Sequence, residues 1–351
     1  MTLLTLHPAH DSTAPNGRST PELPLIPAMS TGPLTPPATS AGLVAAGGLT
    51  TTVPREYVHR ASHAEVFLTG CRRRDDANYA LTGQWPRAHT FFTTPDGAHH
   101  DALQAAETIR QTGLYLAHAE LGVPLGHHFL LHDLTVTTHP EQMSIGSLPT
   151  DLTLHATCTD VVRKGIRLAE FRMQITITGD DGRPYAAGGG RFTCLTPATY
   201  RRLRAAGISG DPLPPAADPF GRPHPDVLAL PGVVGKLHPF DVVLSPTGDA
   251  HRWLLNPDPC HPVLFDHGGD HYPGMVLVEA ARQATHAHHV PANPLTTTLV
   301  TEFHNYAELR APLLIETTLQ PGPVEAPAVR VTGRQNDRAV FTTDVITLTT
   351  P

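Results

Sequence analysis

The feature that most limits how this chain can fold is an apolar stretch that occurs twice with the same polar triplet. Glu-x-x-Arg-Gln begins at Glu107 and again at Glu279, and one shift of 172 residues superposes the two stretches without a gap. The other identical pairs are His89 and His261, Gly97 and Gly269, His99 and His271, Arg110 and Arg282, and Gln111 and Gln283. Polar identities within diverged apolar sequence indicate an internal duplication.

The second copy has the pattern of a buried helix. Pro273 is preset for a first helical position and Gly274 permits close backbone approach, so the pattern predicts a helix over 273–287. Most of the side chains that follow are apolar, which indicates that this helix is buried on nearly all sides. Its polar triplet then lies on one face, inside a core or a pocket. The first copy predicts a helix over 101–120.

Composition excludes several classes of partner. A net charge of −7 and a pI near 6.3 give no general attraction to nucleic acid or acidic membranes. No apolar run is long enough to span a bilayer and no secretory signal is visible, so we expect a cytoplasmic protein without a membrane contact. The four cysteines are scattered, which argues against a zinc ribbon or a disulfide scaffold. The histidines at 286–289 lack acidic or cysteine neighbours, so neither a metal nor a cofactor is expected.

The order of predicted elements divides the chain into four segments. Residues 1–50 are rich in Pro, Ser, Thr and Gly and are expected to form a disordered tail. Residues 51–196 and 233–351 each contain a hairpin, a long helix and several antiparallel strands. Residues 197–232 form a proline-rich connection between these two units.

Two such units favour an α+β tandem hotdog fold, in which each long helix is wrapped by an antiparallel sheet. The first strand of each unit is expected at 64–69 and at 240–245. Each unit alone would leave one sheet edge open, and edge-to-edge pairing of the units would close it. We therefore expect one continuous sheet with the two helices side by side, an intrachain version of a hotdog dimer.

Several short motifs resemble known families. The helix start at 273–280 is similar to that of hotdog acyl carrier protein dehydratases. A closer resemblance, over roughly 53–349, is to the A-factor biosynthesis (AfsA) hotdog family. Its motifs here are Val-Pro-Arg at 53–55, Val-His-Arg at 58–60, Ala-Glu-Val-Phe-Leu-Thr at 64–69, Gln-Trp-Pro-Arg-Ala-His at 84–89 and the two Glu-x-x-Arg-Gln helices.

The resemblance implies an acyltransferase that acts early in the biosynthesis of γ-butyrolactone or butenolide signalling molecules. The donor would be an acyl carrier protein (ACP) that carries a β-ketoacyl chain. The acceptor would be a hydroxyl of dihydroxyacetone phosphate, and the resulting ester can close to a phosphorylated butenolide. The resemblance leaves open whether the chain forms a homodimer.

Acyl transfer from a thioester needs a base, donors for the developing oxyanion and a shielded acyl chain. The candidate catalytic residues are Glu107, Glu279, His99 and His271. Burial would raise the pKa of either glutamate towards that of a general base, unless the neighbouring arginine offsets it. Because His271 and Glu279 are separated by roughly 12 Å along one helix, we expect His271 to pair with Glu107 and His99 with Glu279, across the units. Only the second histidine precedes Tyr-Pro-Gly, so the two sites are expected to be unequal.

The candidate substrate-binding residues come from the same motifs. Arg110 or Arg282 would hold the acceptor phosphate or the β-keto oxygen, and amides near Gly274 would face the thioester carbonyl. The remaining candidates are Gln111, Gln283, Trp85, Arg87 and His89. Each has a simpler interpretation, because Glu-x-x-Arg commonly forms an ion pair within one helix and a tryptophan commonly fills a core.

Two other functions stay open from the residues. Hotdog proteins also dehydrate or hydrolyse acyl-ACP or acyl-CoA, and the fold alone does not decide the chemistry. A regulator that holds an acyl ligand without turnover is the third alternative. A buried arginine in both helices favours transfer to a phosphorylated acceptor. The arginine runs at 72–74 and 201–204 are interpreted as solvated surface rather than as a carrier-protein dock.

Overall fold

The computed structural model describes residues 50–207, 227–266, 268–290, 294–321 and 327–348. These residues belong to one compact unit. The expected disordered tail at 1–50 lies outside the described residues except for its last position. Among the helices within these ranges, none combines the length and the apolar character needed to cross a membrane.

The first unit contains six strands and the first long helix. The helix α1 (Ala102–Tyr115) begins after Asp101, whose side chain accepts a hydrogen bond from the backbone N–H of Leu103, and it continues through a π-helical turn at Leu116–Glu120. The helix expected at 101–120 is therefore confirmed. The strands are β1 (Leu68–Arg73), β2 (Asn78–Trp85), β3 (His128–Thr138), β4 (Thr150–Lys164), β5 (Arg167–Gly179) and β6 (Pro184–Leu195).

The second unit repeats this order. Its helix α3 (Gly274–His288) follows Pro273 as the sequence predicts, and 12 of its residues are buried. The strands are β7 (Leu244–Pro246), β8 (Arg252–Leu255), β9 (Leu295–Phe303), β10 (Leu314–Gln320), β11 (Ala328–Gln335) and β12 (Arg338–Leu348).

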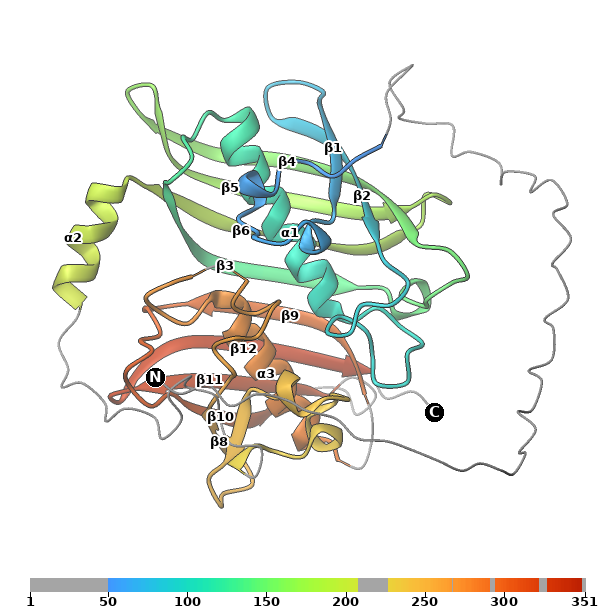
Figure 1. The fold of residues 1–351 in the computed structure, drawn as a ribbon, viewed down its shortest axis with the longest axis vertical. Helices are drawn as coiled ribbons and strands as arrows, with labels where there is room; N and C mark the ends of the chain where they lie inside the picture. The colour runs from blue at the N-terminus through green and yellow to red at the C-terminus, as the bar shows by residue number, and fades with distance from the viewer. Residues whose placement is uncertain (1–49, 208–226, 267, 291–293, 322–326, 349–351) are drawn as a thin grey trace, which may run out of the picture. The chain divides into compact units, whose positions relative to one another are not determined.

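All twelve strands form one sheet in the order β1-β2-β4-β5-β6-β3-β9-β12-β11-β10-β8-β7. The two halves of this order are mirror counterparts about the junction of β3 and β9, where Leu134 pairs with Thr301 and Val136 with Leu299 in antiparallel register. Joining these strands removes an open edge from each unit. The helices α1 and α3 lie on the same face of the sheet and contact each other (Figure 1). The expected tandem hotdog is confirmed, with a continuous sheet and adjacent helices.

The expected first strands of the two units, at 64–69 and 240–245, are only partly correct. Short 3-10 helices, His63–Glu65 and Pro239–Asp241, precede β1 and β7 in the structure. The buried glutamine of each long helix bonds the carbonyl of the last residue of the turn and the N–H two residues later, so those groups are satisfied without a strand partner.

The proline-rich connection begins with a helix that the sequence interpretation missed. Helix α2 (Pro197–Gly207) follows β6, and residues 208–226 of the connection lie outside the described part of the chain. The side chain of Arg204 is only 5% exposed and bonds residues of the second unit, so the expectation of a solvated arginine run at 201–204 is wrong for this residue.

Candidate functional site

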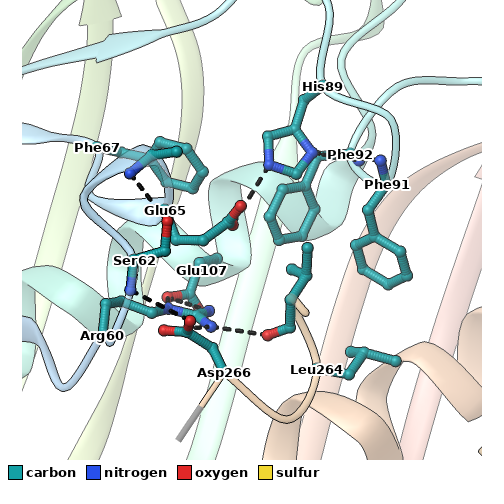
Figure 2. A network of polar contacts seen from close by, with 12 residues as sticks. Arg60, Ser62, Glu65, Phe67, His89, Phe91, Phe92, Glu107, Leu264 and Asp266 are labelled. Carbon is teal, nitrogen blue, oxygen red and sulfur yellow. Dashed lines mark hydrogen bonds and ion pairs between the residues drawn. The ribbon is translucent and has the colours of Figure 1, made fainter. Parts of the chain in front are cut away.

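The carboxylate of Glu107 lies at the centre of a buried polar cluster. Its oxygens accept a hydrogen bond from Nε of Arg60 at 2.9 Å (Figure 2). They also accept from Nε and Nη2 of Arg110 at 2.9 and 2.8 Å, and from Nε2 of Gln111 at 2.8 Å. The Glu107 side chain is 0% exposed and that of Arg60 is 4% exposed. The carboxylate is thus saturated with donors.

Glu279 repeats this arrangement in the second unit. It accepts hydrogen bonds from Arg282 at 2.9 Å through Nε and Nη2 and from Gln283 at 2.6 Å, and Nζ of Lys236 lies 3.2 Å from Oε1. Lys236 therefore takes the place of Arg60. The duplication extends to this residue with a shift of 176 rather than 172.

The cations beside the two glutamates offset the effect of burial, so neither pKa is raised towards that of a general base. Desolvation does raise the pKa of Glu107, but the charges of Arg110 and Arg60 outweigh it and lower that pKa to about 2. Arg282 and Lys236 likewise outweigh desolvation and lower the pKa of Glu279 to about 2. Both carboxylates are ions at neutral pH with their lone pairs occupied, which suits holding a guanidinium in place better than accepting a proton.

Arg60 and Lys236 also join the two units. Nη1 of Arg60 donates to the carbonyl oxygen of Val263 at 2.7 Å, and Nζ of Lys236 donates to the carbonyl oxygen of Phe91 at 3.1 Å. Each cation thus bonds the glutamate of its own unit and the backbone of the other, and we call this pair of contacts the reciprocal latch. The sequence interpretation missed both residues, although extending the match of 240–245 with 64–69 back by four positions pairs them.

Gln111 and Gln283 connect each long helix to the segment before the first strand. Gln111 accepts from the backbone N–H of Phe67 at 3.0 Å and donates to the carbonyl oxygen of Glu65 at 2.7 Å. Gln283 makes the equivalent bonds to Val243 and Asp241. Both glutamines are fully buried and bond the protein itself. Their placement therefore does not support the expectation that they bind substrate.

Three other expected substrate-binding residues also have structural contacts instead. Trp85 is 0% exposed and donates from Nε1 to Oγ1 of Thr108. Arg87 is exposed and donates to the carbonyl oxygen of Gly146. Nδ1 of His89 accepts from the backbone N–H groups of Phe91 and Phe92, and its Nε2 lies 3.3 Å from Glu65 (Figure 2). None of the three lines either of the cavities described next.

A large cavity of ≈ 710 Å³ lies between the two units. It brings the start of α3 together with side chains of α1, β3 and α2. Its polar wall includes His59, Arg60, Arg110, His128, Tyr200, Asp270 and His271, and its apolar wall includes Leu114, Phe129, Leu131, Phe192, Leu264, Met275 and Phe303. This volume is typical of a small-molecule site.

A smaller cavity of ≈ 230 Å³ occupies the counterpart position. It is lined by His99, Asp101 and Ala102 from the first unit and by Arg282 and His286 from the second. In both cavities, then, the histidine before one long helix lines the same cavity as the arginine of the other long helix. Glu107 and Glu279 line neither cavity, so His271 and His99 share their cavities with the arginine partners of these glutamates rather than with the carboxylates themselves.

His271 belongs to a hydrogen-bonded network at the start of α3. Its Nδ1 lies 2.8 Å from Oδ1 of Asp270, which also accepts from the hydroxyl of Tyr200 at 2.6 Å. Nε of Arg204 donates to Oδ2 of Asp270 at 2.9 Å. Desolvation raises the pKa of Asp270, but hydrogen bonds from His271, Tyr200 and Arg204 outweigh it and hold that pKa below its ordinary value. Because an ionised Asp270 can only accept, Nδ1 of His271 carries the proton and Nε2 is the basic atom of the neutral ring.

The smaller cavity lacks this network. Ala98 stands where the second unit has Asp270, and Nδ1 of His99 is buried without a hydrogen-bond partner among the described residues. The ring of His286 also packs over Gly235, so closely that a Cβ on that glycine would lie 2.6 Å from Cδ2. The two sites are therefore unequal, as the sequence predicts.

The two cavities also differ at His59, which lines the large cavity. His59 has φ 53° and ψ 52°, a left-handed conformation, whereas its counterpart in the second unit is Gly235 with φ 66° and ψ 42°. Nε2 of His59 lies 2.9 Å from Nε2 of His118. A histidine in place of glycine at such a position stores backbone strain, which is common at functional sites.

Comparisons with known proteins agree with this architecture. A sheet shared by two hotdog units, with a cavity where they meet, defines a tandem hotdog protein. The A-factor biosynthesis hotdog domain matches residues 44–196 and 224–351, and the chain belongs to this AfsA family.

Two relatives in this family share most of their length with the chain. The 2-oxo-3-(phosphooxy)propyl 3-oxoalkanoate synthase of Streptomyces virginiae is 47% identical over 295 residues, which cover 84% of this chain and 96% of the relative. The synthase of the same name from Streptomyces griseus is 37% identical over 290 residues, covering 82% and 93%. Among solved structures, the 12:0-ACP thioesterase from Umbellularia californica aligns with a TM-score of 0.46 at 9% identity over 80% of this chain and 100% of that chain. So weak a likeness carries no argument about the reaction.

Proposed function

We propose that the chain is an acyltransferase that moves a 3-oxoacyl group to a hydroxyl of dihydroxyacetone phosphate, and that it does so in the large cavity. The relatives that are 47% and 37% identical carry the name of this synthase. The observation that carries the assignment of the site is that His271 and Arg110 line one cavity that also has an apolar wall. The donor is a thioester on an acyl carrier protein, and the product is the precursor of a γ-butyrolactone or butenolide.

His271 supplies the proton transfer in this proposal. Its Nε2 takes the proton of the acceptor hydroxyl while the oxygen attacks the thioester carbonyl carbon. The tetrahedral intermediate then breaks its C–S bond, and the departing thiolate receives the proton from His271. The ester, the free thiol and the neutral histidine remain, so no group is consumed. The first backbone N–H groups of α3, at Gly274 and Met275, face the developing oxyanion.

Arg110 holds the phosphate of the acceptor. Two of its nitrogens bond Glu107, and Nη2 also lies 3.2 Å from the carbonyl oxygen of Val58. Among the described residues, Nη1 has no hydrogen-bond partner, so it is available to a ligand in the cavity. A guanidinium fixed by a carboxylate meets a phosphate oxygen with little further loss of entropy. Glu107 acts through Arg110 as a positioning residue.

The pseudo-symmetry of the chain provides matched variants for the test. Purified protein is incubated with a 3-oxoacyl-ACP, with and without dihydroxyacetone phosphate, and the products are identified by mass spectrometry. We expect a phosphorylated ester only when the acceptor is present. We expect His271→Gln to lower the rate by at least about 100-fold, because general-base catalysis contributes roughly that much. His99→Gln should retain most of the activity.

Each other result has a defined meaning. Release of the thiol without the acceptor would identify a thioesterase, and binding without release would identify an acyl-ligand-binding protein. If His99→Gln were the damaged variant, the smaller cavity would be the working site and the assignment above would be wrong.

A further inference from the structure

Helix α2 contributes to the large cavity although it lies outside the family-matched ranges, which end at residue 196 and resume at 224. Tyr200 and Leu203 line the cavity from this helix. Arg204 fixes the helix to the second unit: Nη1 and Nη2 bond the two carboxylate oxygens of Glu308 at 2.6 and 2.7 Å, and Nη2 also bonds the carbonyl oxygen of Asp270 at 3.2 Å. A buried arginine whose bonds go to Asp270, next to His271, and to Glu308 is a specific attachment rather than a surface contact.

The ring of Tyr200 is held from two sides. His128 stacks on it with ring centroids 3.8 Å apart and an interplanar angle of 8°. Its hydroxyl lies 2.6 Å from Oδ1 of Asp270 and 3.3 Å from Nδ1 of His271. The phenol therefore reaches the point where Asp270 and His271 meet.

Tyr306 completes this packing. Its ring centroid lies 4.5 Å from the guanidinium carbon of Arg204 and 4.8 Å from the ring centroid of His271, with the two rings nearly perpendicular. The imidazole of His271 thus packs against the Tyr306 ring and bonds the carboxylate of Asp270. Both of these groups contact α2.

We infer that Tyr200 and Arg204 of α2 are positioning residues for His271, and that α2 makes the large cavity the working one. This inference rests on the proposed function. Tyr200 and Arg204 bind the two oxygens of Asp270, which leaves that carboxylate one orientation in which it accepts the proton of His271 Nδ1. Nε2 of His271 is then kept as the basic atom. The smaller cavity has Ala98 in place of Asp270, so His99 has no carboxylate at the counterpart position.

The kinetic test compares Tyr200→Phe, Arg204→Gln and Arg204→Lys with a matched control. Tyr79→Phe is the control, because Tyr79 is buried away from the cavity and its hydroxyl has no hydrogen-bond partner among the described residues. We expect Tyr200→Phe to lower kcat about tenfold with little change in KM for the acceptor, since one hydrogen bond to a charged group is lost. Arg204→Gln should lower kcat further, Arg204→Lys should restore part of the loss, and Tyr79→Phe should behave as wild type.

The pH profile separates positioning from a general loss of packing. The charged and titratable groups around His271 are Asp270, Tyr200, Arg204, Tyr306, Glu308 and His128. Without the Tyr200 hydroxyl, Asp270 attracts the protonated imidazole more strongly. The acidic limb of kcat/KM should therefore move to higher pH in Tyr200→Phe. An unchanged kcat and an unchanged profile in this variant would overturn the inference.

A second measurement decides the inference even if the proposed reaction is wrong. In protein labelled with 15N-histidine, we expect His271, assigned with His271→Gln, to be the Nδ1–H tautomer in the wild type. In Arg204→Gln we expect a mixture of the two tautomers. The unfolding temperature of this variant is measured separately, to show that the protein is still folded. If His271 keeps the same single tautomer in both Arg204→Gln and Tyr200→Phe, then α2 does not position it. Failure of the wild type to make the ester would reject the proposed function and leave this test intact.

Discussion

At the scale of single residues, the buried ion pairs of the two long helices contribute most to the structure. Glu107 and Glu279 are 0% exposed, and each contacts two cations and a glutamine amide. Taking a lone carboxylate into such an interior is costly, and removing one partner of a buried pair typically destabilises a protein by about 3–5 kcal/mol. These clusters therefore have a structural effect that is measurable apart from activity.

We expect Glu107→Gln to change how stability depends on pH. The pKa of Glu107 is about 2 in the folded chain against an ordinary value of 4.5, so between these values the unfolded chain binds more protons than the folded one. The stability that the carboxylate contributes is complete above about pH 4.5 and is lost as the pH falls towards 2. The variant should be less stable at pH 7 by about 3 kcal/mol and should have a shallower slope in the acid range.

Urea unfolding at a series of pH values measures both effects. Glu141→Gln is the matched control, because the Glu141 side chain is 66% exposed and should change stability by no more than about 0.5 kcal/mol. A Glu107→Gln protein with the slope and stability of wild type would contradict the role of this carboxylate.

At the scale of elements, the two units differ at the ends of two short 3-10 helices and in the contact of the second unit with α2. The 3-10 helices Arg55–Val58 and Pro231–Val234 are counterparts, and each ends in a left-handed residue. The first unit places His59 there and the second places Gly235, so the same turn faces the large cavity with an imidazole and the small one without a side chain. The element is conserved between the units while its chemistry differs.

His59→Gly should separate strain from function. Glycine adopts the left-handed conformation without a Cβ clash, which offsets much of the lost hydrogen bond to His118, so stability should change by less than about 1 kcal/mol. Transfer to dihydroxyacetone phosphate should fall by about tenfold, because a polar group of the cavity wall is lost. Thermal unfolding and the rate of ester formation measure the two effects.

Asp160→Gly is the matched variant. Asp160 also has a positive φ, 50°, but it lies in β4 and is exposed. It should tolerate the same change with full activity. If His59→Gly were equally active, the strained histidine would have no role in the cavity.

At the scale of the whole molecule, the units are joined too closely to behave as separate domains. The ladder between β3 and β9 runs through the middle of the sheet, and the reciprocal latch adds one buried cation from each side. The cavities are made from both units, so a unit that unfolds alone would lose both sites. One cooperative transition is therefore expected.

The two tryptophans allow this to be measured, because Trp85 in β2 and Trp253 in β8 occupy counterpart strands. In Trp85→Phe the remaining fluorescence reports the second unit, and in Trp253→Phe it reports the first. We expect the fluorescence and far-ultraviolet circular dichroism transitions in urea to coincide in each variant. Two separated transitions would show that the units unfold independently.

Local sequence pattern was sufficient for much of the fold. The apolar helices at 101–120 and 273–287, the antiparallel strands that follow each helix and the tandem hotdog arrangement follow from periodicity and from an internal repeat. The strands at 64–69 and 240–245 were only partly correct, because Gln111 and Gln283 bond that backbone from distant helices.

Fewer residues of the candidate site could be predicted from the sequence. His271, Gly274 and Arg110 were identified and lie on one cavity, whereas Trp85, Arg87, His89 and the two glutamines bond the protein itself. Arg60, Lys236, Asp270 and Tyr200 were missed, since their partners are brought close only by folding.

The chain's residues alone thus establish a duplicated hotdog, its two buried helices and its membership in the AfsA family, because burial pattern and motif are properties of neighbouring positions. Folding decides which histidine meets which arginine, since Arg60 and the Val263 carbonyl that it bonds are 203 residues apart. It also decides that the buried glutamates are ions, because their pKa values depend on the balance between lost hydration and cations supplied from other segments. The inequality of the two cavities has the same origin, as α2 and Asp270 meet His271 in only one of them.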